Sequence, residues 1–205
     1  MKSHHKSDSS SSGGLNMGII VEARNEYTTQ LTNVLKPIIY AGLLSMFEGA
    51  INESDKEDMI LYNFQMELRE IPKWNSDVIK DETSRVLNDC SYFNELLTAV
   101  FLSNVRILTS VKIGGRVNKK FQLVVPTNEN FIHQVYINVG QAVYSNPYLF
   151  SLKKLNGNIT NNINDVFDVI ENSVANTIRH MLPIKNILEV YVTDTVGEDN
   201  NSESE

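Results

Sequence analysis

Apolar residues along most of the chain recur at steps of three and four, the spacing that places them on one face of an α-helix. Between residues 22 and 52 this apolar stripe consists of Leu31, Val34, Leu35, Ile38, Ile39, Leu43, Phe47 and Ile51. Pro37 lies inside the stripe, and because proline has no amide hydrogen we expect the helix to end or kink near Leu35 or Lys36.

The same spacing predicts five further helices, over residues 59–70, 76–87, 91–108, 128–145 and 163–181. Prolines at positions 72, 147 and 183 mark where three of these helices stop. Asn75 or Ser76 can cap one helix, and Thr127 or Asn128 another. Residues 185–192 form a short final helix or strand. The pattern therefore predicts a mainly α-helical fold, built as one multi-helix globular domain.

The segment around residues 105–125 has two interpretations. From Val105 to Ile113 the apolar residues also alternate, Gly114-Gly115 offers a turn, and Phe121 to Val125 is a short β-branched run closed by Pro126. This pattern favours a small β-hairpin near residues 109–125. The alternative is a helix that continues to Ile113 and is followed by an irregular loop.

Composition and charge divide the chain into a body and two tails. The 205 residues carry a net charge of −7, of which −5 lies in residues 193–205 and +1 in residues 1–16, so residues 17–192 carry −3. Both ends lack the apolar content needed to offset chain entropy. We expect a disordered polar tail over 1–16, the helical domain over 17–192 and a disordered acidic tail over 193–205.

The sequence contains none of the common catalytic or phosphate-binding motifs. Gly-Lys-Ser/Thr, Gly-x-Gly-x-x-Gly, His-Glu-x-x-His and Gly-x-Ser-x-Gly are all missing. Cys90 is the single cysteine, so an internal disulfide is excluded, and we interpret it as a buried thiol rather than a nucleophile paired with His133. His133 is interpreted as a partly buried structural residue, and His180 as a helix C-terminal cation. We expect no enzymatic activity, no metal and no cofactor.

A cluster of positive charge stands out against this acidic background. Residues 101–120 contain five bases and no acid: Arg106, Lys112, Arg116, Lys119 and Lys120. Such a cluster is a candidate site for a phosphate backbone, an anionic membrane or an acidic partner. The alternative is a solvated turn, or one whose bases pair with carboxylates elsewhere in the chain.

Three aromatic residues at helix breaks form a candidate interaction patch. Trp74 follows Ile71-Pro72-Lys73, and Tyr148 and Phe150 follow Asn146-Pro147. They can either anchor their loops on the core or contact a partner protein. No transmembrane segment is expected, because the longest nearly apolar stretch, residues 38–47, is about half the length that crosses a bilayer.

Several stretches of the body resemble an uncharacterised group of proteins from nucleocytoplasmic large DNA viruses, the giant viruses of the mimivirus and phycodnavirus type. The matching stretches are Glu70-Ile71-Pro72-Lys73-Trp74-Asn75, Leu97-Thr98-Ala99-Val100-Phe101, Arg106-Ile107-Leu108-Thr109-Ser110-Val111, Phe131-Ile132-His133 and Asn146-Pro147-Tyr148-Leu149-Phe150. They span about residues 57–192 and include no catalytic signature. The resemblance implies a viral protein of the host cytoplasm or viral factory, and it is compatible with packaging in the virion.

These observations lead to two functional hypotheses. The first is a non-enzymatic helical protein of giant-virus assembly or of the virion, which acts through contacts with viral proteins or with further copies of itself. The second is an accessory protein that binds nucleic acid or an anionic surface through residues 106–120, although the net negative charge disfavours nucleic acid.

Overall fold

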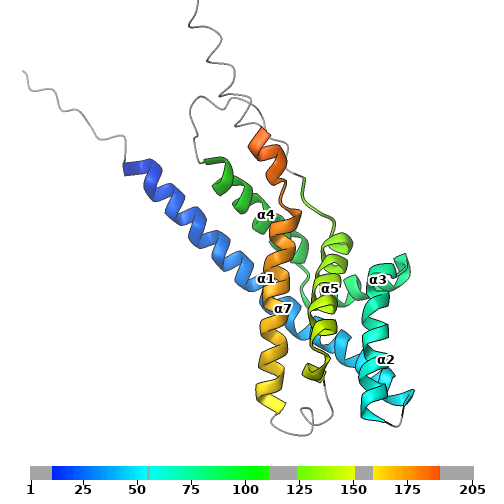
Figure 1. Cartoon of the computed structure of the whole chain (residues 1–205). Coiled ribbons are helices and arrows are strands. Elements are labelled where there is room, and N and C mark those ends of the chain that lie inside the picture. Colours follow the sequence, from blue (N-terminus) through cyan, green and yellow to red (C-terminus); the bar gives the residue numbers. More distant parts are fainter. Residues whose placement is uncertain (1–10, 55, 111–123, 151–158, 190–205) are drawn as a thin grey trace, which may run out of the picture. The chain divides into compact units, whose positions relative to one another are not determined.

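The computed structural model describes residues 11–54, 56–110, 124–150 and 159–189 (Figure 1). The helices are α1 (Ser11–Asn52), α2 (Glu57–Glu70), α3 (Ser76–Asp89), α4 (Phe93–Ser110), α5 (Asn128–Ser145) and α7 (Ile159–Met181). Two short 3-10 helices, η1 (Ile71–Lys73) and η2 (Pro147–Phe150), follow α2 and α5, and residues 184–189 are also helical. These described residues contain no strand, which confirms the prediction of a mainly α-helical domain.

Within this helical domain the residues cluster into two compact units. One unit contains Gln30–Leu97 and Pro126–Met181, and the other contains Met1–Thr29, Thr98–Val125 and Leu182–Glu205. The helices α1 and α4 each contribute to both units. The larger unit holds α2, η1, α3, α5, η2 and α7, together with both grooves described below.

Helix α1 does not end at Pro37, so the prediction of a helix end at Leu35 or Lys36 is wrong. Pro37 and Asn33 are both exposed, and water can therefore hydrate the Asn33 carbonyl that a residue-37 amide would otherwise have bound. On the opposite side of the helix Leu35 and Ile39 are fully buried. Because the helix buries residues both before and after the proline, it stays continuous, although the proline itself costs about 3 kcal/mol of helix stability.

The two predicted tails and the predicted hairpin fall wholly or partly outside the described residues. Of the polar tail predicted over 1–16, residues 1–10 lie outside them, and residues 11–16 belong to α1, which begins at Ser11. The acidic tail over 193–205 lies outside the described residues. Most of the predicted hairpin near 109–125 also lies outside the described residues. At its two ends, Thr109 and Ser110 are the last residues of helix α4, and residues 124–125 have no regular structure.

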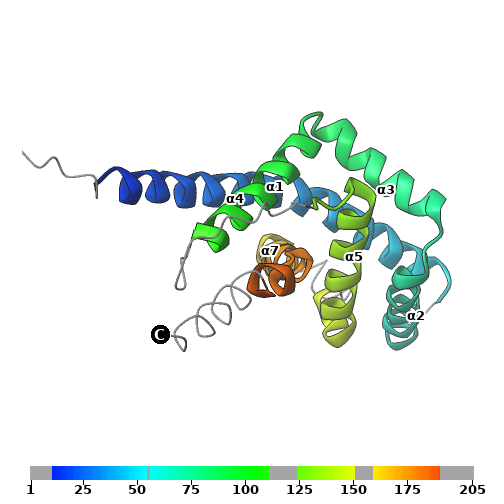
Figure 2. The same cartoon turned by 90° about the horizontal axis from the view of Figure 1, so that it is seen from above.

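Helix α5 is the centre of the larger unit. It packs against α7 on one side and against α2, η1 and α3 on the other (Figures 1 and 2). Thr127 caps α5 by accepting a hydrogen bond from the Asn130 amide, and Asn75 caps α3 by accepting from the Asp77 and Val78 amides. Both caps are among those the sequence predicts, and they fix where α3 and α5 begin.

An aromatic cluster forms the core beside α5. The Phe47, Phe64 and Phe150 rings are fully buried, and their centroids lie 5.2 to 5.9 Å apart. Tyr40 of α1 stacks on Phe150 and meets Phe167 of α7 edge to face. Each such ring contributes about 1.5–3 kcal/mol by burial. This cluster connects α1, α2, η2 and α7.

A second close contact in the core depends on a glycine. At Gly42 of α1, a β-carbon would lie 2.3 Å from the Tyr136 hydroxyl oxygen and 3.1 Å from two atoms of its ring. Only a residue without a β-carbon leaves room for the fully buried Tyr136 of α5. Gly42 therefore sets the distance between α1 and α5.

The smaller unit has a modest core of its own. Val105 of α4 and Ile187 of the last helical segment are buried together, and Leu108 and Leu182 pack against them. In the same unit the Ser110 hydroxyl lies 3.5 Å from the Met17 sulfur.

One helix among the described residues is long and apolar enough to cross a membrane: the part of α1 from Met17 to Asn52. Buried helices of non-membrane proteins have the same length and composition. The contacts of Tyr40, Gly42 and Phe47 with α2, η2, α5 and α7 bury one part of this stretch in the core of the larger unit, and about 33% of its most apolar window is buried.

Candidate binding grooves on either side of α5

The link between α2 and α3 is held tightly on α5. At Gly140 a β-carbon would lie 2.6 Å from the Ile71 Cδ1 atom, so the missing side chain lets the fully buried Ile71 approach α5 closely. The His133 imidazole Nε2 lies 2.8 Å from the Ile71 carbonyl oxygen and donates a hydrogen bond to it. In addition, the Gln65 side-chain amide donates to the Tyr144 carbonyl at 2.8 Å.

A stack of rings continues from this link towards α3. Trp74 is half-buried and stacks on His133 with ring centroids 5.9 Å apart, and its ring lies 5.0 Å from that of Tyr136. The Tyr136 hydroxyl donates a hydrogen bond of 2.5 Å to the Glu82 carboxylate, and Arg85 pairs with the same carboxylate at 2.9 Å. Burial, and then the neighbouring Glu82 carboxylate, raise the pKa of Tyr136 well above its ordinary value of 10.0.

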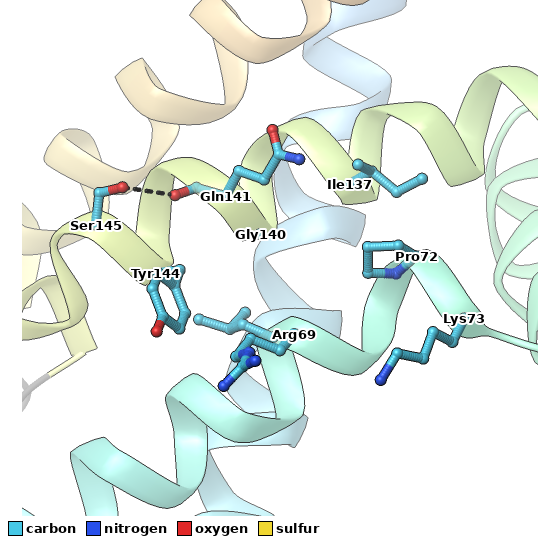
Figure 3. A pocket seen from close by; sticks show the side chains of 9 residues that line it. Arg69, Pro72, Lys73, Ile137, Gly140, Gln141, Tyr144 and Ser145 are labelled. Carbon is cyan, nitrogen blue, oxygen red and sulfur yellow. Dashed lines mark hydrogen bonds between the residues drawn. The ribbon is translucent and has the colours of Figure 1, made fainter.

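An open groove of about 600 Å³ lies between α5 and the α2–η1 segment (Figure 3). We call it the cationic groove, because its lining includes two bases and no acid. Arg69, Pro72 and Lys73 line the α2–η1 side, and Ile137, Gln141, Tyr144 and Ser145 line the α5 side, as Figure 3 shows. Leu68 and Gly140 complete the lining.

The two bases of the cationic groove are available to an anion. Arg69 is exposed, and a guanidinium nitrogen lies 3.9 Å from the Met66 sulfur, a weak acceptor. Within the described part of the chain, this contact leaves most of the guanidinium donors free for other groups. Lys73 pairs with Glu70 at 2.7 Å, but both side chains are more than half exposed. Exposed pairs of this kind are worth about 1 kcal/mol or less, so an incoming carboxylate can compete with Glu70.

A second groove, of about 430 Å³, lies on the other side of α5, against α7. We call it the amide groove, because half of its eight lining side chains are amides. Asn138, Gln141 and Ala142 come from α5, and Val169, Asn172, Ser173, Asn176 and His180 come from α7. Gln141 lines both grooves.

The predicted aromatic patch does not form a single surface. Phe150 is fully buried among Phe47 and Phe64, so of its two predicted roles it has the first, an anchor of its loop on the core, and it is not available as part of an exposed patch. The half-buried Trp74 ring packs on His133 and Tyr136 of α5. Tyr148 alone of the three is largely exposed, at 64%.

The predicted basic cluster is described in part. Arg106 lies on the exposed side of α4, near the end of that helix. Lys112, Arg116, Lys119 and Lys120 lie outside the described residues.

Cys90 and His133, considered from the sequence as a catalytic pair, are both engaged in contacts within the fold. Cys90 is a free, buried cysteine at the end of α3, and its amide donates to the Val86 carbonyl. His133 is half-buried and has its ring engaged by Trp74 and by the Ile71 carbonyl. The predicted burial of both residues is confirmed. In the part of the chain that the structure describes, no three His, Cys, Asp or Glu residues are grouped as metal ligands would be.

The cationic groove was not predicted from the sequence. A local signal did exist, because Arg69 and Lys73 are four residues apart in a chain segment with few other bases. Their partners in the groove, Ile137 and Tyr144, lie on a helix more than sixty residues further along the chain. No local pattern connects these two segments.

The fold defines an α-helical protein whose helix α5 borders two open grooves. Residues 17–151 match a family of unknown function, DUF5764, and the chain belongs to that family. The matched range contains the whole lining of the cationic groove, whereas the α7 wall of the amide groove lies beyond it. No curated protein and no solved structure matches the chain.

Proposed function

We propose that this is a non-enzymatic helical protein of giant-virus assembly or of the virion, and that it acts through protein–protein contacts in the cationic groove. The viral context, with the host cytoplasm or viral factory as its location, is supported by the sequence stretches that resemble proteins of giant viruses. The groove supports the mode of action. Its single most informative feature is a pair of exposed bases in a lining that also contains the apolar residues Leu68 and Ile137.

The chemistry of the groove favours an acidic partner segment that also carries an apolar side chain. Arg69 has donors free for a carboxylate, which a guanidinium can bind through two parallel hydrogen bonds. Leu68 and Ile137 supply apolar surface below the bases, and Tyr144 is partly exposed at the groove edge. Tyrosine and arginine are the residue types that dominate the energy of protein interfaces.

The chain itself carries an acidic segment of this type. Residues 193–205 hold five acids and no base, together with Val196. A second copy of the chain can therefore supply the partner segment, which makes self-association one form of this proposal. The other form is an acidic segment of another viral protein.

A synthetic peptide of residues 193–205 tests the groove directly. Its binding to the full chain can be followed by fluorescence anisotropy at about 50 mM and 500 mM salt, where screening differs strongly. We expect salt-sensitive binding that weakens about tenfold or more in the double variant Arg69→Ser/Lys73→Ser. Lys80→Ser, an exposed lysine of α3 outside the groove, is the control and should leave binding unchanged.

Equal binding by the double variant and the parent chain would contradict a role for the groove. Light scattering on the purified chain and proteomics of viral particles test the wider proposal. A strict monomer that is absent from particles would count against an assembly or virion role.

The alternative function is an accessory protein that binds nucleic acid or an anionic surface through residues 106–120. It is favoured by the exposed position of Arg106 on α4. If Arg116→Ser/Lys119→Ser/Lys120→Ser abolishes salt-dependent binding of DNA or of anionic vesicles, and the groove variant does not, the alternative is correct.

A further inference from the structure

We infer that the amide groove between α5 and α7 binds the main chain of an extended, uncharged polypeptide segment. This site is distinct from the cationic groove and does not depend on the function proposed for it. The inference rests on the spacing of its polar side chains, on their unused hydrogen-bonding capacity and on the neutral lining of the groove.

Three polar side chains follow each other along the α7 wall at a regular interval. Asn172, Asn176 and His180 are four residues apart, are all exposed and all line the groove. On an α-helix this interval corresponds to about 6 Å per step. In an extended polypeptide, equivalent groups of every second residue lie about 6.6–6.8 Å apart. Each of the three side chains can therefore reach a peptide group of one extended segment about four residues long.

Among the residues that the structure describes, the polar side chains that line the amide groove leave much of their hydrogen-bonding capacity unused. Asn172, Gln141 and His180 form no side-chain hydrogen bond to any other residue that the structure describes. Asn176 accepts one hydrogen bond from Arg179 at 2.8 Å, which leaves its amide hydrogens free. Because each side-chain amide offers both a donor and an acceptor, it can match the N–H and C=O groups of a peptide.

The α5 wall of the groove is held in place by its own hydrogen bonds. The Asn138 amide donates to the Thr177 hydroxyl at 2.7 Å and accepts from Gln134 at 3.3 Å. The Thr177 hydroxyl in turn donates to the Ser173 carbonyl at 2.8 Å. This network joins α5 to α7 and fixes the width of the groove before a ligand arrives.

Other ligand classes fit the groove less well. Its lining contains no Lys, Arg, Asp or Glu, so neither a phosphate nor a carboxylate finds a permanent counter-charge. It contains no Phe, Tyr or Trp on which a nucleobase can stack. A neutral main chain with small side chains complements the neutral lining and the shallow apolar contacts offered by Ala142 and Val169.

Nuclear magnetic resonance on the isotope-labelled full chain tests this inference. The probe is the capped peptide acetyl-(Ser-Thr)₄-amide, which is uncharged and favours an extended conformation because threonine is β-branched. We expect the side-chain amide signals of Asn172 and Asn176 to shift on titration up to about 10 mM, with little effect of salt because no charge pair forms. The same peptide with alternate main-chain nitrogens methylated should bind at least fivefold more weakly.

Matched variants locate the site. Asn172→Ala should weaken binding about threefold to tenfold through the loss of one hydrogen bond, whereas Asn33→Ala, at an exposed helical position of α1, should not. Alanine favours helix at both positions, so both variants should fold. Equal binding by the methylated peptide, equal effects of the two variants, or no shift at 10 mM would each overturn the inference. A shift with cellotriose but not with the peptide would also overturn it, because the groove would then recognise sugar hydroxyls.

Discussion

At the scale of single residues, Gly42 controls how closely α1 and α5 pack. Gly42→Ala places a β-carbon 2.3 Å from the Tyr136 hydroxyl, and this hydroxyl is already committed to Glu82. We expect a loss of about 1–3 kcal/mol in the free energy of unfolding, the usual cost of overpacking a core. Urea denaturation measures the difference.

Gly49 of the same helix provides the matched control for this prediction. It is exposed, and a β-carbon there meets nothing within 4 Å. Gly49→Ala should therefore stabilise the protein by about 0.5–1 kcal/mol, because alanine is the better helix former. If both variants change stability by the same amount, Gly42 has no packing role.

The buried Tyr136 hydroxyl makes stability depend on alkaline pH. In the unfolded chain this phenol loses its proton near 10.0, whereas burial and the Glu82 carboxylate raise the pKa of Tyr136 in the folded protein. Above pH 10 the unfolded state is therefore deprotonated while the folded state still holds the proton. The stabilisation is complete below pH 10 and is lost progressively as the pH rises above it.

Tyr136→Phe removes this titration. We expect the variant to be less stable than the parent chain at pH 8, because the hydrogen bond to Glu82 is lost, and to lose less stability between about pH 9 and 11. Chemical denaturation at several pH values compares the two profiles. Parallel profiles would show that the hydroxyl does not titrate differently in the folded protein.

At the scale of elements, Pro37 tests whether buried side chains hold α1 together. The helix continues through this exposed proline, although no amide hydrogen is available there for the Asn33 carbonyl. Pro37→Ala supplies that hydrogen and removes the steric conflict of the ring, so we expect about 1–3 kcal/mol of added stability. Thermal unfolding measures it, with Asn33→Ala as the control for a change at an exposed position. A destabilised Pro37→Ala variant would contradict this explanation.

Helix ends follow from local chemistry, and the sequence is therefore a good guide to them. The caps at Asn75 and Thr127 and the stops before Pro72, Pro147 and Pro183 need only neighbouring residues, and the structure has all of them. A helix end at Pro37 is predicted wrongly, because the effect of this proline depends on what the rest of α1 buries. Local rules describe the cost of a proline but not the tertiary contacts that compensate for it.

At the scale of the whole molecule, the grooves arise from contacts between distant parts of the chain. Gln65 and Tyr144 are 79 residues apart, Ile71 and His133 are 62 apart, and Glu82 and Tyr136 are 54 apart. Each pair joins the α2–α3 segment to α5. A periodic apolar pattern predicts that α5 is buried on one face but does not say which helices cover it, so neither groove could be derived from the sequence.

We propose, at this scale, that the protein works by holding an acidic partner segment in the cationic groove. Site-specific photocrosslinking during infection tests this claim most directly. A benzoylphenylalanine at position 144, at the groove edge, is compared with one at position 92, an exposed tyrosine outside the groove lining. We predict that position 144 crosslinks to an acidic segment of a viral protein or of a second copy, and that the crosslink is lost in Arg69→Ser/Lys73→Ser. Crosslinks from position 92 with none from position 144 would contradict the account.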